Sequence, residues 1–108
     1  MVKLRHRKIV WDNEAKHSLR SIYEYIKNKE SPTVAKRVRG KIIEQVKTIA
    51  SFPEKFQREP FLKDEPGDYR YKVIWSYKII YETTPSTIFI LDIFHTSRNP
   101  SNIKISKN

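Results

Sequence analysis

A histidine and an arginine near the end of the last apolar segment are the residues best suited to chemistry. A metal-independent ribonuclease needs a base for the 2′-OH proton, a cation for the charged phosphorane and an acid for the leaving oxygen. His95 and Arg98 could supply these functions. A lone histidine at a strand end is more often structural, so a structural role is the alternative for both residues.

Basic and aromatic residues nearby could hold a target. Base-stacking rings beside phosphate-binding cations are typical of single-stranded RNA sites. The tyrosines could instead belong to the core, and the cations could simply solvate a sheet edge. The candidates are Arg70, Lys72, Lys78, Tyr77 and Tyr81.

Several classes of site are excluded. The three histidines are far apart in the sequence and there is no cysteine, so we expect no metal. With only Gly40 and Gly67, no phosphate-cradling glycine loop can form, and no cofactor is expected.

The chain of 108 residues has 22 Lys plus Arg against 12 Asp plus Glu, a net charge of +10. Its length supports one domain, for which we take residues 1–100, with 101–108 as a flexible polar tail. The absence of cysteine and of any apolar run of about 20 residues favours a cytoplasmic protein without a membrane span. A basic surface attracts phosphate polymers or acidic proteins, although it can also serve solubility alone.

The pattern of apolar residues predicts the elements that position these side chains. We expect an opening strand over 2–10, a helix after Asp12, a second helix from Ser31-Pro32 to about Ala50, and a loop over 51–68. Three strands follow, over 69–75, 77–82 and 87–94. The result is an α+β fold of order β-α-α-β-β-β, in which an antiparallel helical hairpin covers one face of an antiparallel sheet.

Strand alternation predicts which side chains share a face. We expect the aromatic side, with Tyr69, Tyr77 and Tyr81, to lie under the helices, because burying Arg70 or Lys72 unpaired costs several kcal/mol. The last strand has apolar residues on both sides, with Ile88, Ile90 and Phe94 on one side and Phe89, Leu91 and Ile93 on the other. An apolar strip beside cations could take an amphipathic partner.

This order of elements resembles the RelE/ParE superfamily of toxins from bacterial type II toxin–antitoxin modules, the plasmid-stabilisation type. The likeness extends from about Val2 to Pro100. The residues that carry it are Trp11, Ala15, Leu19, Ile22, Tyr25-Ile26, Phe52-Pro53, Tyr69-Arg70, the run from Tyr77 to Tyr81 and the run from Ile90 to Arg98.

The resemblance implies a toxin neutralised by a cognate antitoxin whose flexible segment wraps the helical and sheet surfaces. The residues that we expect the antitoxin to contact are Ile88, Ile90, Phe94, Arg37 and Lys41.

The superfamily divides by target. RelE-like members cleave mRNA at the ribosome, whereas ParE-like members poison DNA gyrase. At the place of the RelE-like catalytic arginine this sequence has Val73-Ile74-Trp75, and the C-terminal catalytic tyrosine has no counterpart in 101–108. The ending from His95 to Pro100 and the arginine at position 70 look more ParE-like, which favours gyrase. A ribosome-dependent endoribonuclease using His95 and Arg98, and an inactive basic binding module, are the alternatives.

Overall fold

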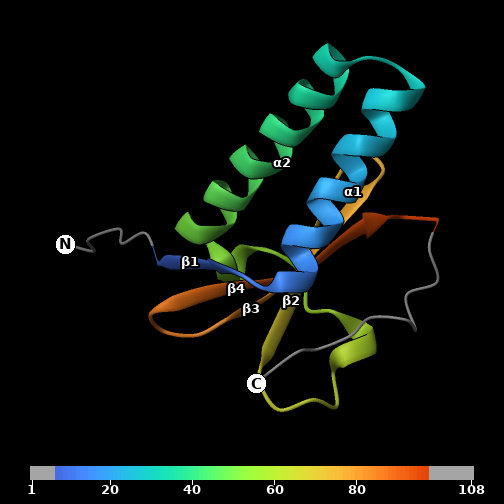
Figure 1. The fold of residues 1–108 in the computed structure, drawn as a ribbon. Coiled ribbons are helices and arrows are strands. Elements are labelled where there is room, and N and C mark those ends of the chain that lie inside the picture. The colour runs from blue at the N-terminus through green and yellow to red at the C-terminus, as the bar shows by residue number, and fades with distance from the viewer. Residues whose placement is uncertain (1–6, 98–108) are drawn as a thin grey trace.

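The computed structural model describes residues 7–97 of the chain. The predicted start of the first strand, Arg98 and the polar tail lie outside these residues. The element order confirms the predicted β-α-α-β-β-β arrangement (Figure 1). The elements are β1 Lys8–Trp11, α1 Asn13–Lys29, α2 Pro32–Ser51, the 3-10 turns η1 Pro53–Lys55 and η2 Pro60–Leu62, β2 Asp68–Ile74, β3 Tyr77–Thr83 and β4 Thr87–His95.

Both helices of the hairpin begin where the sequence predicts. Asp12 is extended and its carbonyl accepts from Lys16 N, so α1 begins directly after it. Ser31 Oγ accepts from Val34 N at 3.1 Å, and Pro32 takes the first helical position, where its missing N–H costs nothing. Both helices rise away from the sheet as one pair (Figure 1).

The segment between α2 and β2 has more order than the predicted loop. Each of its two 3-10 turns starts at a proline, Pro53 or Pro60. The carboxylate of Glu59 caps the second turn by accepting from Phe61 N at 3.1 Å. The backbone bonds from Glu59 N to Tyr69 O and from Tyr71 N to Gln57 O hold the segment against the sheet.

The sheet has the strand order β1-β4-β3-β2. The strands β2, β3 and β4 form the predicted antiparallel meander. The first strand pairs with β4 in parallel, from Lys8 opposite Thr87 to Trp11 opposite Ile90, so the expectation of a purely antiparallel sheet was wrong. The parallel pairing is possible because the intervening chain returns to the same end of the sheet.

The helices cover one sheet face, and the segment after α2 covers part of the other. The first core contains Ala15, Ile42, Val46, Ile49, Ala50, Ile79, Tyr81, Ile88, Ile90 and Ile93. The second contains Leu62, Tyr69, Ile80, Leu91 and Phe94. Each face of the sheet therefore has its own apolar cluster.

The turn between β2 and β3 has two residues, Trp75 and Ser76, because Ile74 pairs with Tyr77. Arg70 consequently faces the same side as Tyr81, which lies in the helix-side core, and Tyr69 faces the opposite side. The predicted sharing of one face by Tyr69 and Tyr81 was wrong. A one-residue shift in a strand pair moves every side chain of one strand to the other face.

A bulge in β4 changes its faces as well. Ile80 pairs with Asp92 whereas Tyr81 pairs with Ile90, so β4 holds one extra residue. Beyond the bulge, Phe94 joins the second core and not the face of Ile88 and Ile90 with which we grouped it.

Candidate functional site

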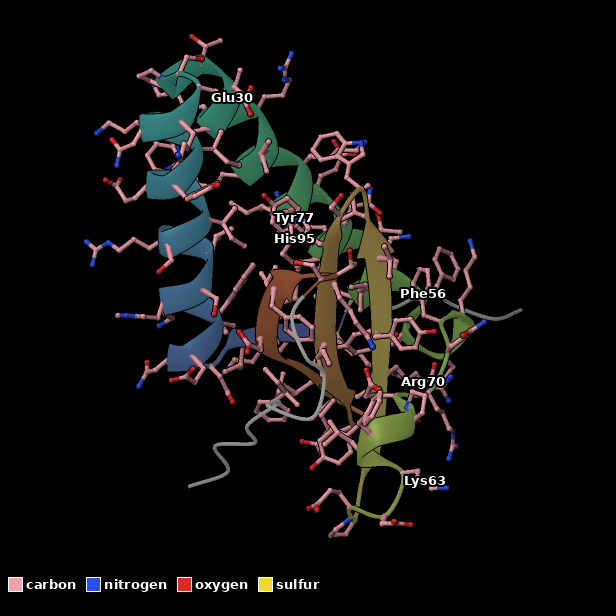
Figure 2. All side chains as sticks on the ribbon, turned by 90° about the vertical axis from the view of Figure 1, so that its right-hand side faces the viewer. Glu30, Phe56, Lys63, Arg70, Tyr77 and His95 are labelled. Atoms are coloured by element: carbon pink, nitrogen blue, oxygen red, sulfur yellow. The ribbon has the colours of Figure 1, made fainter. Side chains whose placement is uncertain are left out.

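The predicted histidine lies at the end of β4, beside a tyrosine of β3. His95 pairs with Tyr77 in the ladder, and their rings meet edge to face at a centroid distance of 5.7 Å and an angle of 85° (Figure 2). The imidazole is exposed, and Tyr77 is half-buried. Burial raises the pKa of the Tyr77 hydroxyl, with smaller contributions from Tyr25 and Glu30.

His95 forms its hydrogen bonds through Nδ1. Its Nδ1 accepts from the backbone N–H of Ser97 at 3.2 Å, and Ser97 Oγ lies 2.8 Å from the same atom. A backbone N–H can only donate, so this bond requires a free lone pair on Nδ1. A proton on Nδ1 would therefore compete with this bond.

His95 lines an open groove of about 720 Å³ between the hairpin and the sheet. Glu30 is the one carboxylate in its described lining, and no Lys or Arg of the described chain lines it. Its lining residues are Ser21, Ile22, Tyr25, Ile26, Glu30, Val38, Tyr77, His95 and Ser97. Arg98 lies outside the described residues, so the expected proximity of His95 and Arg98 stays a prediction.

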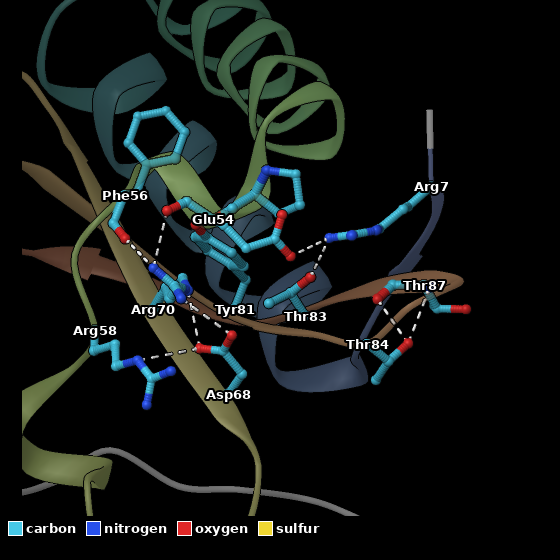
Figure 3. Close-up of polar contacts among 11 residues, drawn as sticks. Arg7, Glu54, Phe56, Arg58, Asp68, Arg70, Tyr81, Thr83, Thr84 and Thr87 are labelled. Carbon is cyan, nitrogen blue, oxygen red and sulfur yellow. Dashed lines mark hydrogen bonds and ion pairs between the residues drawn. The ribbon is translucent and has the colours of Figure 1, made fainter. Parts of the chain in front are cut away.

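Arg70 is bound within the fold and is only 12% exposed. Its Nη1 donates to the carbonyls of Glu54 at 3.1 Å and Phe56 at 2.7 Å, and its Nε donates to Asp68 at 2.9 Å (Figure 3). These bonds hold the segment after α2 against β2. The arginine therefore contributes to the scaffold.

The two lysines of the predicted set do not share one face. Lys72 Nζ lies 4.4 Å from the ring centroid of Phe56. Lys78 Nζ lies 2.6 Å from Oε1 of the buried Glu59 and 4.3 Å from the ring centroid of Tyr71. Of these two lysines, Lys78 has a carboxylate partner and Lys72 has none in the described part of the chain.

Four residues of the predicted site lie in the cores. Tyr81 is fully buried, and its hydroxyl donates to the carbonyl of Pro53 at 2.6 Å. Burial raises its pKa, an effect that Arg70 partly opposes. Ile88 and Ile90 are fully buried and Phe94 is 5% exposed. The expectation that these four side chains contact a partner directly does not fit this burial.

A cationic groove of about 530 Å³ lies on the flank of the hairpin next to β1. Arg39 of α2 stacks 4.4 Å from the ring centroid of Tyr23 of α1. The groove is lined by Trp11, Lys16, Leu19, Arg20, Tyr23, Glu24, Arg39 and Ile43. The sequence analysis missed this surface, although Lys16 and Arg20 are spaced four residues apart on one side of α1.

The basic residues expected to meet the antitoxin lie on α2. Arg37 is exposed, and Lys41 is half-buried with its Nζ 3.1 Å from Glu44. Within residues 7–97, no cluster of three or more His, Asp or Glu residues could bind a metal, and no helix is long and apolar enough to span a bilayer.

A solved structure, "Chromosomal ParDE TA system from P. aeruginosa", contains a chain with the same fold. It aligns with a TM-score of 0.70 at 23% identity, over 83% of this chain and 96% of that one. Comparison with curated proteins gave no significant match.

A two-helix hairpin packed on a four-stranded mixed sheet, with the residues quoted above, defines a toxin of the RelE/ParE superfamily. The family profile of the ParE toxin of type II toxin–antitoxin systems, parDE, matches residues 9–100. The chain therefore belongs to the ParE toxin family.

Proposed function

We propose that this chain is a growth-inhibiting toxin that a cognate antitoxin neutralises, and that the free toxin acts by binding DNA gyrase. Family membership supports the toxin role. The observation that carries the choice of target is the surrounding of His95. A toxin that works by protein binding needs no acid–base pair, whereas a ribonuclease does.

The groove at His95 is poorly suited to RNA cleavage. Its described lining offers no cation for a phosphate, and Glu30 would repel one. Protonation of Nδ1 would break the bond from Ser97 N, because an N–H cannot accept. An apolar groove with two tyrosines suits a protein partner better.

We further propose that the antitoxin contacts the cationic groove and the exposed outer side of α2. Lys16, Arg20 and Arg39 surround an apolar floor that includes Leu19 and Ile43. An acidic amphipathic segment complements this combination of charge and apolar surface. Arg37 is exposed on the same helix but lies two residues from Arg39, so it belongs to the outer side of α2 and not to the groove.

The gyrase proposal is tested with the purified full chain, DNA gyrase, supercoiled plasmid and ATP. We expect cleaved plasmid to accumulate on addition of the toxin and to disappear with the antitoxin. Mapping of ribosome-associated mRNA after induction in cells should show intact transcripts. Cleavage at ribosomal A-site codons, with no effect on gyrase, would contradict the proposal and favour the endoribonuclease. No growth arrest would favour an inactive binding module.

The antitoxin surface is tested with Arg20→Glu and Arg39→Glu, each of which reverses one charge of the groove. Both variants should bind the antitoxin more weakly by about tenfold, since each loses an ion pair or gains a repulsion. Lys27→Glu on the exposed end of α1 is the control. Equal weakening by all three variants would indicate only a general effect of net charge.

A further inference from the structure

The outer edge of β2 is only partly covered. This strand ends the sheet, and its second neighbour is the segment after α2. Tyr69 O accepts from Glu59 N at 2.8 Å, and Tyr71 N donates to Gln57 O at 3.0 Å. These two bonds form a single antiparallel bridge, with Arg58 opposite Arg70.

Beyond this bridge the edge is open. Backbone groups along an antiparallel strand point alternately to its two neighbours, so Val73 points outward like Tyr69 and Tyr71. Within the described chain, no hydrogen bond reaches Val73 N–H, Val73 C=O or Tyr71 C=O on this side. The Val73 side chain is 47% exposed. Unpaired strand edges of this kind accept additional strands.

Trp75, two residues after Val73, has an unusual backbone conformation. Trp75 has φ of 54°, in the left-handed region that bulky residues seldom adopt, and its side chain is 56% exposed. The residue after β4 holds this turn in place, because Ser76 O accepts a hydrogen bond from Thr96 N at 2.8 Å. Strained positions that persist cluster at functional sites, and exposed tryptophans are common anchors of interfaces.

Two cations lie on the helix side of this edge. Lys72 Nζ and Lys55 Nζ lie 4.4 Å and 5.8 Å from the ring centroid of Phe56. Neither ammonium has a carboxylate within ion-pair distance in the described chain. The opposite side carries the Val73 side chain and the ring of Tyr71. Lys78 also lies on this opposite side, over the Tyr71 ring, but it is mostly buried and its charge is paired with Glu59. The ammonium groups without a carboxylate partner therefore lie on the helix side of the edge, and the opposite side offers the exposed Val73 side chain.

We propose that the β2 edge at Val73 is a strand-addition site for an extended peptide that alternates acidic and apolar residues, with Trp75 as its anchor. Side chains of an added strand alternate between the two faces. Its acidic residues would face Lys72 and Lys55, and its apolar residues would lie beside Val73. Backbone bonds to Val73 supply affinity, and the alternation supplies specificity. The site does not depend on gyrase being the target.

The test uses the ¹⁵N-labelled full chain and a capped peptide, Val-Glu-Val-Glu-Val-Glu-Val. We expect shifts of the Val73 and Trp75 amides and of the Trp75 indole, with Trp11 unmoved. The same peptide with lysine in place of glutamate should bind about tenfold more weakly or not at all. Equal binding of both peptides, or shifts centred elsewhere, would overturn the proposal.

Val73→Pro removes one outward N–H without touching the ladder to β3, and proline is tolerated on an edge that faces solvent. Peptide affinity should fall by about tenfold with little change in the thermal midpoint. Trp75→Gly should weaken binding without lowering that midpoint, because glycine adopts positive φ freely. Phe61→Ala, at an exposed phenylalanine of η2, is the control and should bind normally.

If Val73→Pro does not fold, reversing the charge of the two lysines tests the same proposal. Lys55→Glu combined with Lys72→Glu should bind the lysine peptide better than the glutamate peptide. An unchanged preference would mean that these lysines merely protect an exposed edge.

Discussion

Lys78 Nζ of β3 lies 2.6 Å from Oε1 of Glu59, whose side chain is fully buried. The other carboxylate oxygen, Oε2, accepts from Phe61 N. This carboxylate therefore joins the second 3-10 turn to the sheet face that the helices leave open. A buried ion pair of this kind is costly to break from one side only, because the remaining charge keeps its desolvation penalty.

Glu59→Gln is expected to lower the free energy of unfolding by about 3 kcal/mol, since it leaves the Lys78 ammonium without its countercharge. Urea denaturation measures the loss. The double variant Glu59→Leu with Lys78→Leu should recover most of the stability, because no charge then remains buried. A double variant as unstable as Glu59→Gln would show that the pair is a source of stability in itself.

Tyr81→Phe removes the hydroxyl that donates to the carbonyl of Pro53 at 2.6 Å. The buried carbonyl loses its donor, so we expect a loss of about 2 kcal/mol in the free energy of unfolding. The measurement is again urea denaturation. Tyr71→Phe is the matched control, because the Tyr71 hydroxyl binds Gln57 at the surface and its loss should be nearly neutral.

The stability of the native protein should fall as the pH rises above 10. Burial raises the pKa of the Tyr81 hydroxyl from its ordinary value of 10.0. Above that value the unfolded chain loses the proton while the folded chain retains it, so the free energy of unfolding decreases with pH. The free energy of unfolding, measured by urea denaturation at about pH 9 and about pH 11, should differ less between the two pH values for Tyr81→Phe than for the native protein. Equal separation would contradict this assignment.

The helical hairpin could be predicted because its signals are local. Ser31 and Pro32 act on the residues directly after them, and the apolar stripe around Ile42 and Val46 repeats at the helical period. The identity of the ParE fold followed from the same local order of elements. Local signals of this kind do not depend on how distant strands pair.

The site was harder to predict because side-chain faces depend on pairing. Trp75 occupies a turn position that favours glycine or asparagine, so nothing in the sequence marks a two-residue turn there. The bulge beside Leu91 has no local signal either. Because of the turn, Arg70 lies on the other face than predicted and contacts the segment after α2. Because of the bulge, Phe94 lies in the second core.

Arg70→Met tests whether this arginine is structural. The change keeps an apolar stem of similar length but removes the bonds to the carbonyls of Glu54 and Phe56 and to Asp68. Charged hydrogen bonds at a mostly buried site lead us to expect a loss of about 2 kcal/mol. Lys55→Met, at an exposed cation nearby, should be close to neutral. A stable Arg70→Met that has lost toxicity would instead place Arg70 in the target interface.

Gly40→Ala should stabilise the protein. Gly40 lies in the middle of α2, where glycine costs about 0.8 kcal/mol relative to alanine, and an added Cβ would meet nothing within 4 Å. For a domain of this size we expect the thermal midpoint to rise by about 4 °C, measured by circular dichroism. Gly67→Ala is the control of opposite sign, because φ there is 135° and the Cβ would lie 2.9 Å from Glu82 Oε2 and Tyr69 Cε2. If Gly40→Ala raised the midpoint and also weakened antitoxin binding, the open space above Gly40 would be where the antitoxin approaches α2. A fall in the midpoint would contradict the expected gain in helix propensity.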